Sequence, residues 1–381
     1  MAPDETSDQN TKLGDVSSNR KNNLTVIRML MAVAIIYRHS YMTLSGHSVR
    51  DAFSYLTNRQ TDTLGVGVIY FFMMSGFLIT AAWLHRRSTW EYLRRRALRL
   101  YPGVAVMSLF CLLVVGPLAV TDTSTYFHHL SLRGYLTSLA RLQVPAIQAA
   151  FPGNPLAGKI NDPMWSIVYQ FRCYLIVAIL GLAGALRYRA LVLAIFLAAM
   201  SAFIWQTYFD PTWLANKGGH FTGMMGEWPP LLTFFTAGMV FYLYRDVIPY
   251  NRKLFLFSVL VVVASFYKGL AITEPIFGGY VLLYIGFARR LALHRFAGGA
   301  DYSFGLYIYS WPIQQLLTQH FHNYLSPITL FLVSLAVTSV LAMGSYAFVE
   351  KRFIIRKPKA ASALKPVPNL AAESAEIQPV S

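Results

Sequence analysis

Two basic side chains in the first apolar stretch, Arg28 and His39, have a spacing suited to joint chemistry. Eleven residues of α-helix turn about 1100°, only ~20° beyond three full turns, and rise ~16.5 Å. We therefore expect both side chains on one face. A guanidinium at one end can hold an anionic substrate, while an imidazole in the other half transfers a proton. The structural alternative is an arginine that reaches the membrane interface and a histidine hydrogen-bonded to a neighbouring helix.

A cluster of arginines follows the second apolar stretch, in the segment WEYLRRRALRLYP. Arg95, Arg96 and Arg99 form an RRxxR pattern beside Arg94, at the entry to the third helix. Guanidinium groups on adjacent helical turns can bind phosphates in bidentate fashion. The alternative is that these residues only mark the cytoplasmic end of a membrane helix.

Polar residues also open the fourth apolar stretch, NDPMWSIVYQFRCYL. Trp165 is most simply an interfacial anchor. Gln170 and Arg172 need polar partners at membrane depth, so they predict, with Ser166, a polar cavity. The second stretch, GVGVIYFFMMSGFLIT, differs in being rich in small residues, which indicate close helix packing.

The segments that carry these residues have the composition of membrane helices. Hydrophobic residues make up 55% of the 381 residues and charged residues 13%, about half the share in a soluble domain, and the mean hydropathy is +0.43. Apolar stretches of membrane-spanning length predict an all-α bundle of about ten transmembrane helices. They lie at 24–44, 63–84, 101–121, 164–186, 190–209, 228–245, 254–270, 275–288, 302–321 and 328–350. Residues 254–288 fit either two short helices or one helix and a re-entrant piece.

The distribution of positive charge predicts the orientation of these helices. With the N-terminus inside, twenty-three of the 33 lysines and arginines fall in cytoplasmic segments and six in outer loops. Both termini are then cytoplasmic. We expect a polar N-terminal tail (1–23) without a removable signal, a membrane domain (24–350), and a tail (351–381) that is basic and then disordered.

Composition also argues against several other classes of protein. The net charge of +16 is spread over loops, with no basic soluble domain to bind nucleic acid. Cys111 and Cys173 both lie inside apolar stretches, so neither a disulfide framework nor a cysteine metal site is expected. We expect no metal and no bound cofactor.

Several of these segments, taken in order, resemble the acyltransferase-3 family of integral membrane acyltransferases. The resemblance rests on the spacing of Arg28 and His39, the second stretch ending at Thr80, the RRxxR before Pro102, and the WSI…FRCY segment. DYSFGLYIYSWPIQQ (301–315) and SYAFVEKRF (345–353) extend it, so that it covers roughly residues 24–353.

This resemblance implies a cytosolic acyl-CoA donor, usually acetyl-CoA, and transfer to a sugar hydroxyl at the outer side. His39 would be the essential histidine, and the donor would be bound by Arg28, Arg95, Arg96 and Arg99. The chain departs from the family at two positions. Most relatives have a glutamate where this chain has Gln170, and many have a histidine where it has Ser310.

We therefore expect a multi-pass protein of the bacterial inner membrane that acylates a polysaccharide or lipid-linked oligosaccharide. Its site would combine the catalytic residues His39 and Gln170 with a substrate cavity formed by Trp165, Ser166, Arg172 and Ser310. The lipid bilayer, acyl-CoA and the glycan are the expected partners, and nucleic acid is not. A transporter or flippase of glycan intermediates is the alternative, and a polysaccharide polymerase or ligase a third. Donor consumption that depends on His39 would distinguish the enzyme from the transporter.

Overall fold

The computed structural model describes residues 11–19, 22–47, 49–86, 88–147, 149–215, 217–219, 223–295, 300–321 and 324–353. The predicted disordered tail lies outside this range from residue 354 onward. Helices make up about three quarters of the described residues, and the sheet in this part of the chain is one two-stranded hairpin of β1 (Gly218–Gly219) and β2 (Gly223–Met224). The predicted all-α class is confirmed.

Long helices account for every predicted apolar stretch. In chain order they are α2 (Leu24–Ser45), α4 (Thr63–Leu84), α5 (Thr89–Phe110), α9 (Met164–Leu182), α10 (Arg189–Tyr208), α11 (Trp228–Leu243), α12 (Arg252–Ala264), α14 (Gly279–Phe287), α15 (Ser303–Phe321) and α16 (Pro327–Ser345). Shorter helices connect them: α1 (Leu13–Ser17), α3 (Ala52–Leu56), α6 (Gly116–Ala119), α7 (Thr123–His128), α8 (Leu132–Ala140), α13 (Leu270–Thr273) and α17 (Lys351–Phe353). Single π-helical turns at Cys111–Val115, Glu274–Gly278 and Tyr346–Glu350 join consecutive helices.

Six helical segments in the described part of the chain are long and apolar enough to cross a membrane. They are Thr63–Leu84, Thr89–Ala119, Met164–Leu182, Arg189–Tyr208, Leu270–Phe287 and Pro327–Phe353. Helices α2 and α15 are not among the six. Both bury polar side chains, His39 on α2 and Gln314 on α15 among them, as expected of helices that line a polar interior. The figure of ten crossings and the orientation of the termini stay predictions.

The helix boundaries differ from the prediction at one place and settle an ambiguity at another. Helix α5 begins at Thr89, capped by Ser88, whose Oγ accepts from the Glu91 amide at 3.1 Å, and not near residue 101 as predicted. The arginine cluster therefore lies on the helix itself. In 254–288, α12 is followed by a turn and then by α13, a π turn and α14, which run on to Phe287. This is the arrangement of two helices, not a re-entrant piece.

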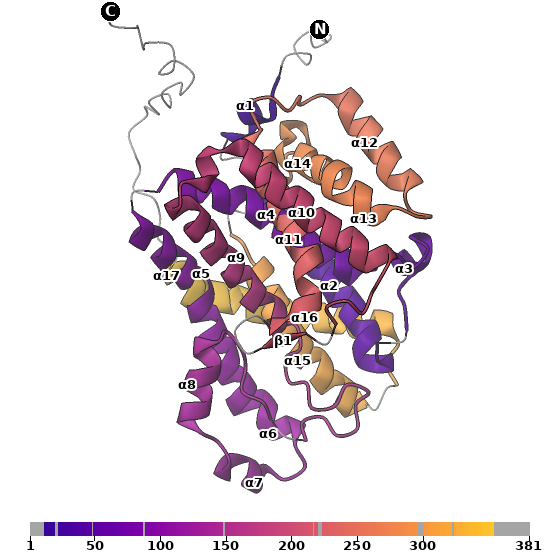
Figure 1. Cartoon of the computed structure of the whole chain (residues 1–381). Helices are drawn as coiled ribbons and strands as arrows, with labels where there is room; N and C mark the ends of the chain where they lie inside the picture. The colour runs from indigo at the N-terminus through magenta and orange to yellow at the C-terminus, as the bar shows by residue number, and fades with distance from the viewer. Residues whose placement is uncertain are drawn as a thin grey trace, which may run out of the picture.

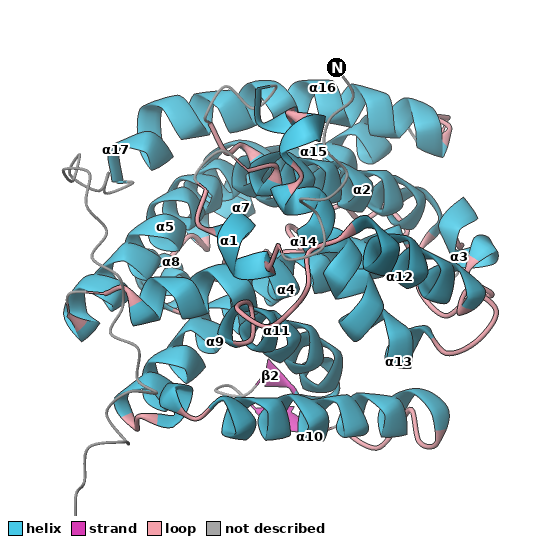
Figure 2. Cartoon of the chain, turned by 90° about the horizontal axis from the view of Figure 1, so that it is seen from above, coloured by secondary structure: helices cyan, strands magenta, loops and turns pink. Residues whose placement is uncertain are grey.

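The helices pack as layers between two outer helices. Figure 2 shows α16 along one edge and α10 along the opposite edge, with α2, α15, α4 and α11 between them. The backbones of α4 and α11 touch, because a Cβ at Gly76 would overlap the carbonyl of Phe235, and one at Gly238 would overlap that of Met73. The predicted packing role of the small residues in the second stretch is thus confirmed.

Hydrogen bonds join the connecting segments into two groups at opposite ends of the bundle. At one end the Leu13 amide donates to the carbonyl of Ile248 (3.0 Å), and the Asn23 side chain donates to that of Ala288 (2.9 Å). At the other end the Gln60 side chain donates to the carbonyl of Ser265 (2.9 Å). Figure 1 places α1 at the first end and α7 at the far one. The segments that these bonds join are ones predicted to share a side of the membrane, and which side is cytoplasmic stays a prediction.

Candidate active site

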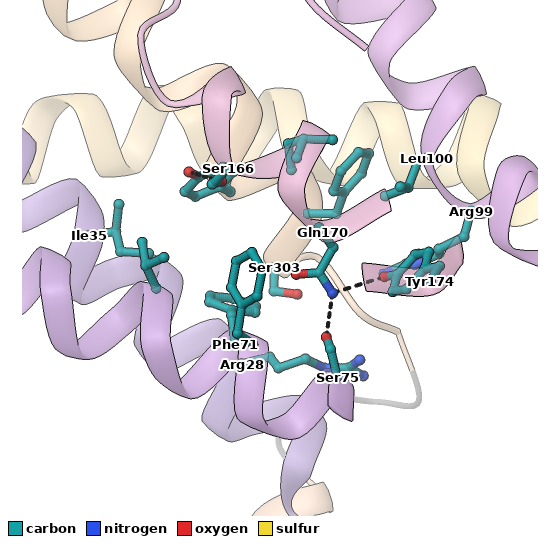
Figure 3. A pocket seen from close by; sticks show the side chains of 15 residues that line it. Arg28, Ile35, Phe71, Ser75, Arg99, Leu100, Ser166, Gln170, Tyr174 and Ser303 are labelled. Carbon is teal, nitrogen blue, oxygen red and sulfur yellow. Dashed lines mark hydrogen bonds between the residues drawn. The ribbon is translucent and has the colours of Figure 1, made fainter. Parts of the chain in front are cut away.

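A cavity with an empty volume of about 650 Å³ lies between α2, α4, α5, α9 and α15. Figure 3 shows the side chains that surround it. The lining residues are Arg28, Ile35, Val68, Phe71, Phe72, Ser75, Arg99, Leu100, Ser166, Ile167, Gln170, Tyr174, Ser303, Phe304 and Tyr307. Four of the predicted site residues are among them: Arg28, Arg99, Ser166 and Gln170.

Helix α9 presents two faces, and only one of them lines the cavity. Ser166, Gln170 and Tyr174 recur every four residues and share the cavity face. Trp165 and Arg172 lie on a different face. The indole ring of Trp165 meets the Tyr169 ring edge-on, with centroids 5.7 Å apart, and the Arg172 guanidinium lies 5.3 Å from the centre of that ring. The structure thus separates Ser166 and Gln170 from Trp165 and Arg172.

One end of the cavity is cationic. Arg28 and Arg99 converge on a single carboxylate oxygen of Asp301, at 3.0 Å and 2.8 Å, and Arg99 also reaches Glu350 at 3.3 Å. Burial raises the pKa of Asp301, but the charges of Arg28 and Arg99 and the hydrogen bonds from Ser303 lower it further, so the net pKa lies below its ordinary value. Two guanidinium groups held side by side by fixed carboxylates form a ready site for a phosphate.

The other two arginines of the RRxxR pattern lie apart from this pair. Arg95 is bonded to Glu91 one turn earlier on α5, at 2.6 Å and 3.1 Å, and does not line the cavity. Arg96 lies 6.0 Å from the Tyr174 ring, and its Nε is buried without a partner among the described residues. The pattern therefore contributes one arginine, Arg99, directly to the cavity.

Neutral polar groups line the middle of the cavity. The Gln170 amide donates to Ser75 Oγ at 2.6 Å and to the Tyr174 hydroxyl at 3.1 Å (Figure 3). The Tyr307 hydroxyl lies 2.6 Å from Ser166 Oγ and donates to the carbonyl of Pro163 at 2.8 Å.

Ser310, which stands where many relatives have histidine, is fully buried and donates to the backbone carbonyl of Tyr307 at 3.1 Å. It supports the wall of the cavity and does not line it.

His39 lies just past the opposite end of the cavity from Asp301. It is one helical turn beyond the lining residue Ile35 on α2, as Trp311 is one turn beyond Tyr307 on α15. Its ring meets the Trp311 ring edge-on at 5.0 Å and 90°. The side chain is buried, and its Nδ1 forms no hydrogen bond with any described residue. A buried polar atom without a partner is costly, and such atoms are typical of sites that bind a substrate group.

Gln170 and His39, the two predicted catalytic residues, are not hydrogen-bonded to each other among the described residues. The amide is instead bonded to Ser75 and Tyr174. In the described part of the chain no three His, Cys, Asp or Glu side chains gather as metal ligands, and Cys111 and Cys173 are buried free thiols.

The sequence analysis missed Asp301 and Glu350, which fix the two arginines, and Ser75 and Tyr174, which fix Gln170. All four lie in segments that the sequence analysis had quoted, although their contacts could not be read from it. Asp301 opens the DYSFGLY segment, Glu350 lies in SYAFVEKRF, Ser75 is in the second stretch and Tyr174 follows Gln170 by one turn.

Comparison with known proteins places the chain among acyl-transferring enzymes. The profile of a family described as the acyltransferase domain matches residues 21–347. The O-acetyl transferase of Shigella phage Sf6 is 25% identical over 346 residues, which are 89% of this chain and 97% of that protein. Nodulation protein 10 of Rhizobium leguminosarum bv. viciae is 26% identical over 208 residues, 51% of this chain and 54% of that protein. No solved structure matches.

Proposed function

Because this chain belongs to the acyltransferase domain family, we propose that it is a membrane O-acetyltransferase that moves an acetyl group from acetyl-CoA to a sugar hydroxyl of a surface polysaccharide or lipid-linked glycan. One observation carries the proposal beyond family membership. Arg28 and His39 lie on one helix, the first at the cationic end of the cavity and the second just past its other end.

The donor enters from the cationic end, which the charge distribution assigns to the cytoplasm. Its phosphates bind Arg28 and Arg99, which Asp301 and Glu350 hold in position. Arg96, next to Tyr174, adds positive charge at this end. The thin acyl-carrying arm then extends along the face of α2 that includes Ile35, past the hydroxyls of Ser75, Ser166 and Tyr307, towards His39.

The chemical step needs one base. A ring nitrogen of His39 takes the proton of the acceptor hydroxyl as its oxygen attacks the thioester carbonyl, and the carbon–sulfur bond breaks. The imidazolium then returns the proton to the departing thiolate, so that the products are the sugar ester and free CoA. In the alternative, His39 first carries the acyl group on its ring and then transfers it to the sugar.

Mass spectrometry of the surface glycan tests this function. Glycan from cells with the protein should carry one acetyl group per modified unit, and glycan from cells without it should not. Glycan from cells that make a His39→Ala variant at equal abundance should also lack the acetyl group. Identical spectra from all three strains would refute the proposal and favour the transporter reading.

A further inference from the structure

A second cavity, with three arginines in its lining, opens at the predicted outer end of the bundle. Its empty volume is about 670 Å³. The lining comes from α2, from the residues that connect α2 to α4 and from the start of α4: Arg38, His47, Arg50, Ser54, Arg59, Thr61, Asp62 and Gly65. Three arginines line it: Arg38, Arg50 and Arg59. Nothing in the proposed donor site uses any of them.

Arg38 is the buried member of this outer pocket, with 5% of its side chain exposed. Its Nε donates to Asp62 at 2.8 Å, which ties α2 to the start of α4. Its Nη1 is buried and has no partner among the described residues. An ion pair with a purely structural role would explain why Nε is bonded to Asp62, but not why Nη1 is buried without an acceptor. A buried guanidinium N–H without an acceptor, at the wall of a cavity, is a donor available to a ligand.

The two carboxylates near Arg38 are already engaged. Asp62 accepts from the amide of Gly65 at 2.8 Å, and so caps α4 in addition to its bond with Arg38. Asp51 is fully buried and accepts from the amides of Ser54 and Thr63, at 2.8 Å and 3.0 Å. Hydrogen bonds to the backbone fix these two acids near Arg38 and leave their charges in place, so they offset two of the three positive charges of the pocket.

Arg50 and Arg59 are exposed and form no ion pair with a described residue. Arg50 reaches only the hydroxyl of Ser54, at 3.4 Å. Arg59 has a left-handed backbone, with φ of 64°. Its backbone N–H donates a hydrogen bond to the carbonyl of Ser54 at 2.6 Å. A non-glycine residue in this region is uncommon, because the conformation is less favourable for a side chain with a Cβ.

We infer that this outer pocket binds an anionic group, a carboxylate or a phosphate, on the acceptor glycan. Three guanidinium groups against two engaged carboxylates leave a net positive site, and guanidinium groups match both anions in bidentate fashion. Arg38 directly precedes His39, so the pocket lies at the depth of the imidazole, on an adjacent face of α2. That the bound anion belongs to the acceptor glycan rests on the proposed function.

The experiment is arginine footprinting of the full-length protein in lipid nanodiscs. Phenylglyoxal labels accessible guanidinium groups, and mass spectrometry reads the labelling of each arginine. Three probes are compared: methyl glucuronide for a carboxylate, glucose 1-phosphate for a phosphate, and methyl glucoside as the neutral match. Arg133, on helix α8 of the same expected outer side, is the control because it does not line the pocket.

We expect one or both anionic sugars to reduce labelling of Arg50 and Arg59 at least threefold, with no effect of methyl glucoside and none at Arg133. Which probe protects identifies the anion. A charged hydrogen bond is worth about a factor of ten in affinity. Arg50→Gln and Arg59→Gln should therefore each weaken binding of the protecting sugar about tenfold, whereas Arg133→Gln should not.

Equal labelling with all three probes, or equal protection at Arg133, would overturn the inference. The outcome is separate from that of the proposed function. Loss of protection with intact His39-dependent use of acetyl-CoA would refute only the outer pocket. Protection without such acetyl-CoA use would refute only the acetyltransferase assignment.

Discussion

Replacement of Arg99 by lysine tests whether this arginine binds the donor or has only a structural role in α5. The Arg99 guanidinium spans two carboxylates, Asp301 at 2.8 Å and Glu350 at 3.3 Å, with 23% of its side chain exposed. A lysine keeps the charge but has one ammonium group, so it cannot span both acids and present a planar fork to a phosphate. Arg95 lies one turn earlier, and its ion pair among the described residues is with Glu91.

The lost interaction sets the expected size of the effect. A hydrogen bond to a charged group contributes about 1.5–3 kcal/mol, and partial exposure favours the lower figure, which is about tenfold in affinity. We therefore expect Arg99→Lys to raise the KM for acetyl-CoA about tenfold with a smaller change in kcat. Arg95→Lys should stay within about twofold, because a lysine can still pair with Glu91 across one helical turn.

The assay is initial-rate CoA release by the protein in nanodiscs, with acetyl-CoA varied at a fixed acceptor concentration and both variants at matched abundance. Equal increases in KM at the two positions would show that Arg99 contributes no more to donor binding than Arg95 does. An unchanged KM for Arg99→Lys would remove Arg99 from the donor site.

Three further predictions address stability and the polar wall of the cavity. The pKa of Asp301 is lowered on folding, so its ion pairs stabilise the protein above the ordinary carboxyl pKa and are lost as pH falls through the lowered value. As the pH is lowered below about 4, the melting temperature of Asp301→Asn should therefore fall less than that of the wild type. Gln170→Ala and Ser75→Ala each break the same 2.6 Å hydrogen bond, so kcat/KM of the double variant should match the worse single variant, and additive losses would contradict their coupling. Gly76→Ala would place a methyl group against a backbone carbonyl and should lower the melting temperature, by an overpacking cost of about 1–3 kcal/mol; Gly344→Ala, which meets open space, should leave it unchanged.

The helical fold could be predicted well because it depends on local composition. Each apolar stretch became a helix, since a membrane helix satisfies its own backbone hydrogen bonds. The start of α5 was missed because the arginines there suggested a loop. Ser88 with Glu91 three residues later is an N-cap signal, and it would have placed the start correctly.

The candidate site was predicted in part, because local spacing could be read from the sequence and distant pairings could not. The periodicity of α9 separates Ser166 and Gln170 from Trp165, and that much is readable from residue spacing. The pairing of Arg99 with Asp301 and Glu350 joins residues more than 200 positions apart, which no local pattern encodes. The difference between Arg95 and Arg99 was partly readable, because Glu91 stands one turn before Arg95.

The central claim is that His39 performs acyl transfer at the end of a donor-binding cavity. The most direct measurement is transfer of labelled acetyl groups from acetyl-CoA to glycan, by wild type and His39→Ala in membranes at matched abundance and melting temperature. Loss of a proton-transfer group typically costs 10²- to 10⁴-fold, so transfer by His39→Ala should fall at least about 100-fold, with the KM for acetyl-CoA little changed. Transfer within a few-fold of wild type would contradict the account and leave His39 as a packing partner of Trp311.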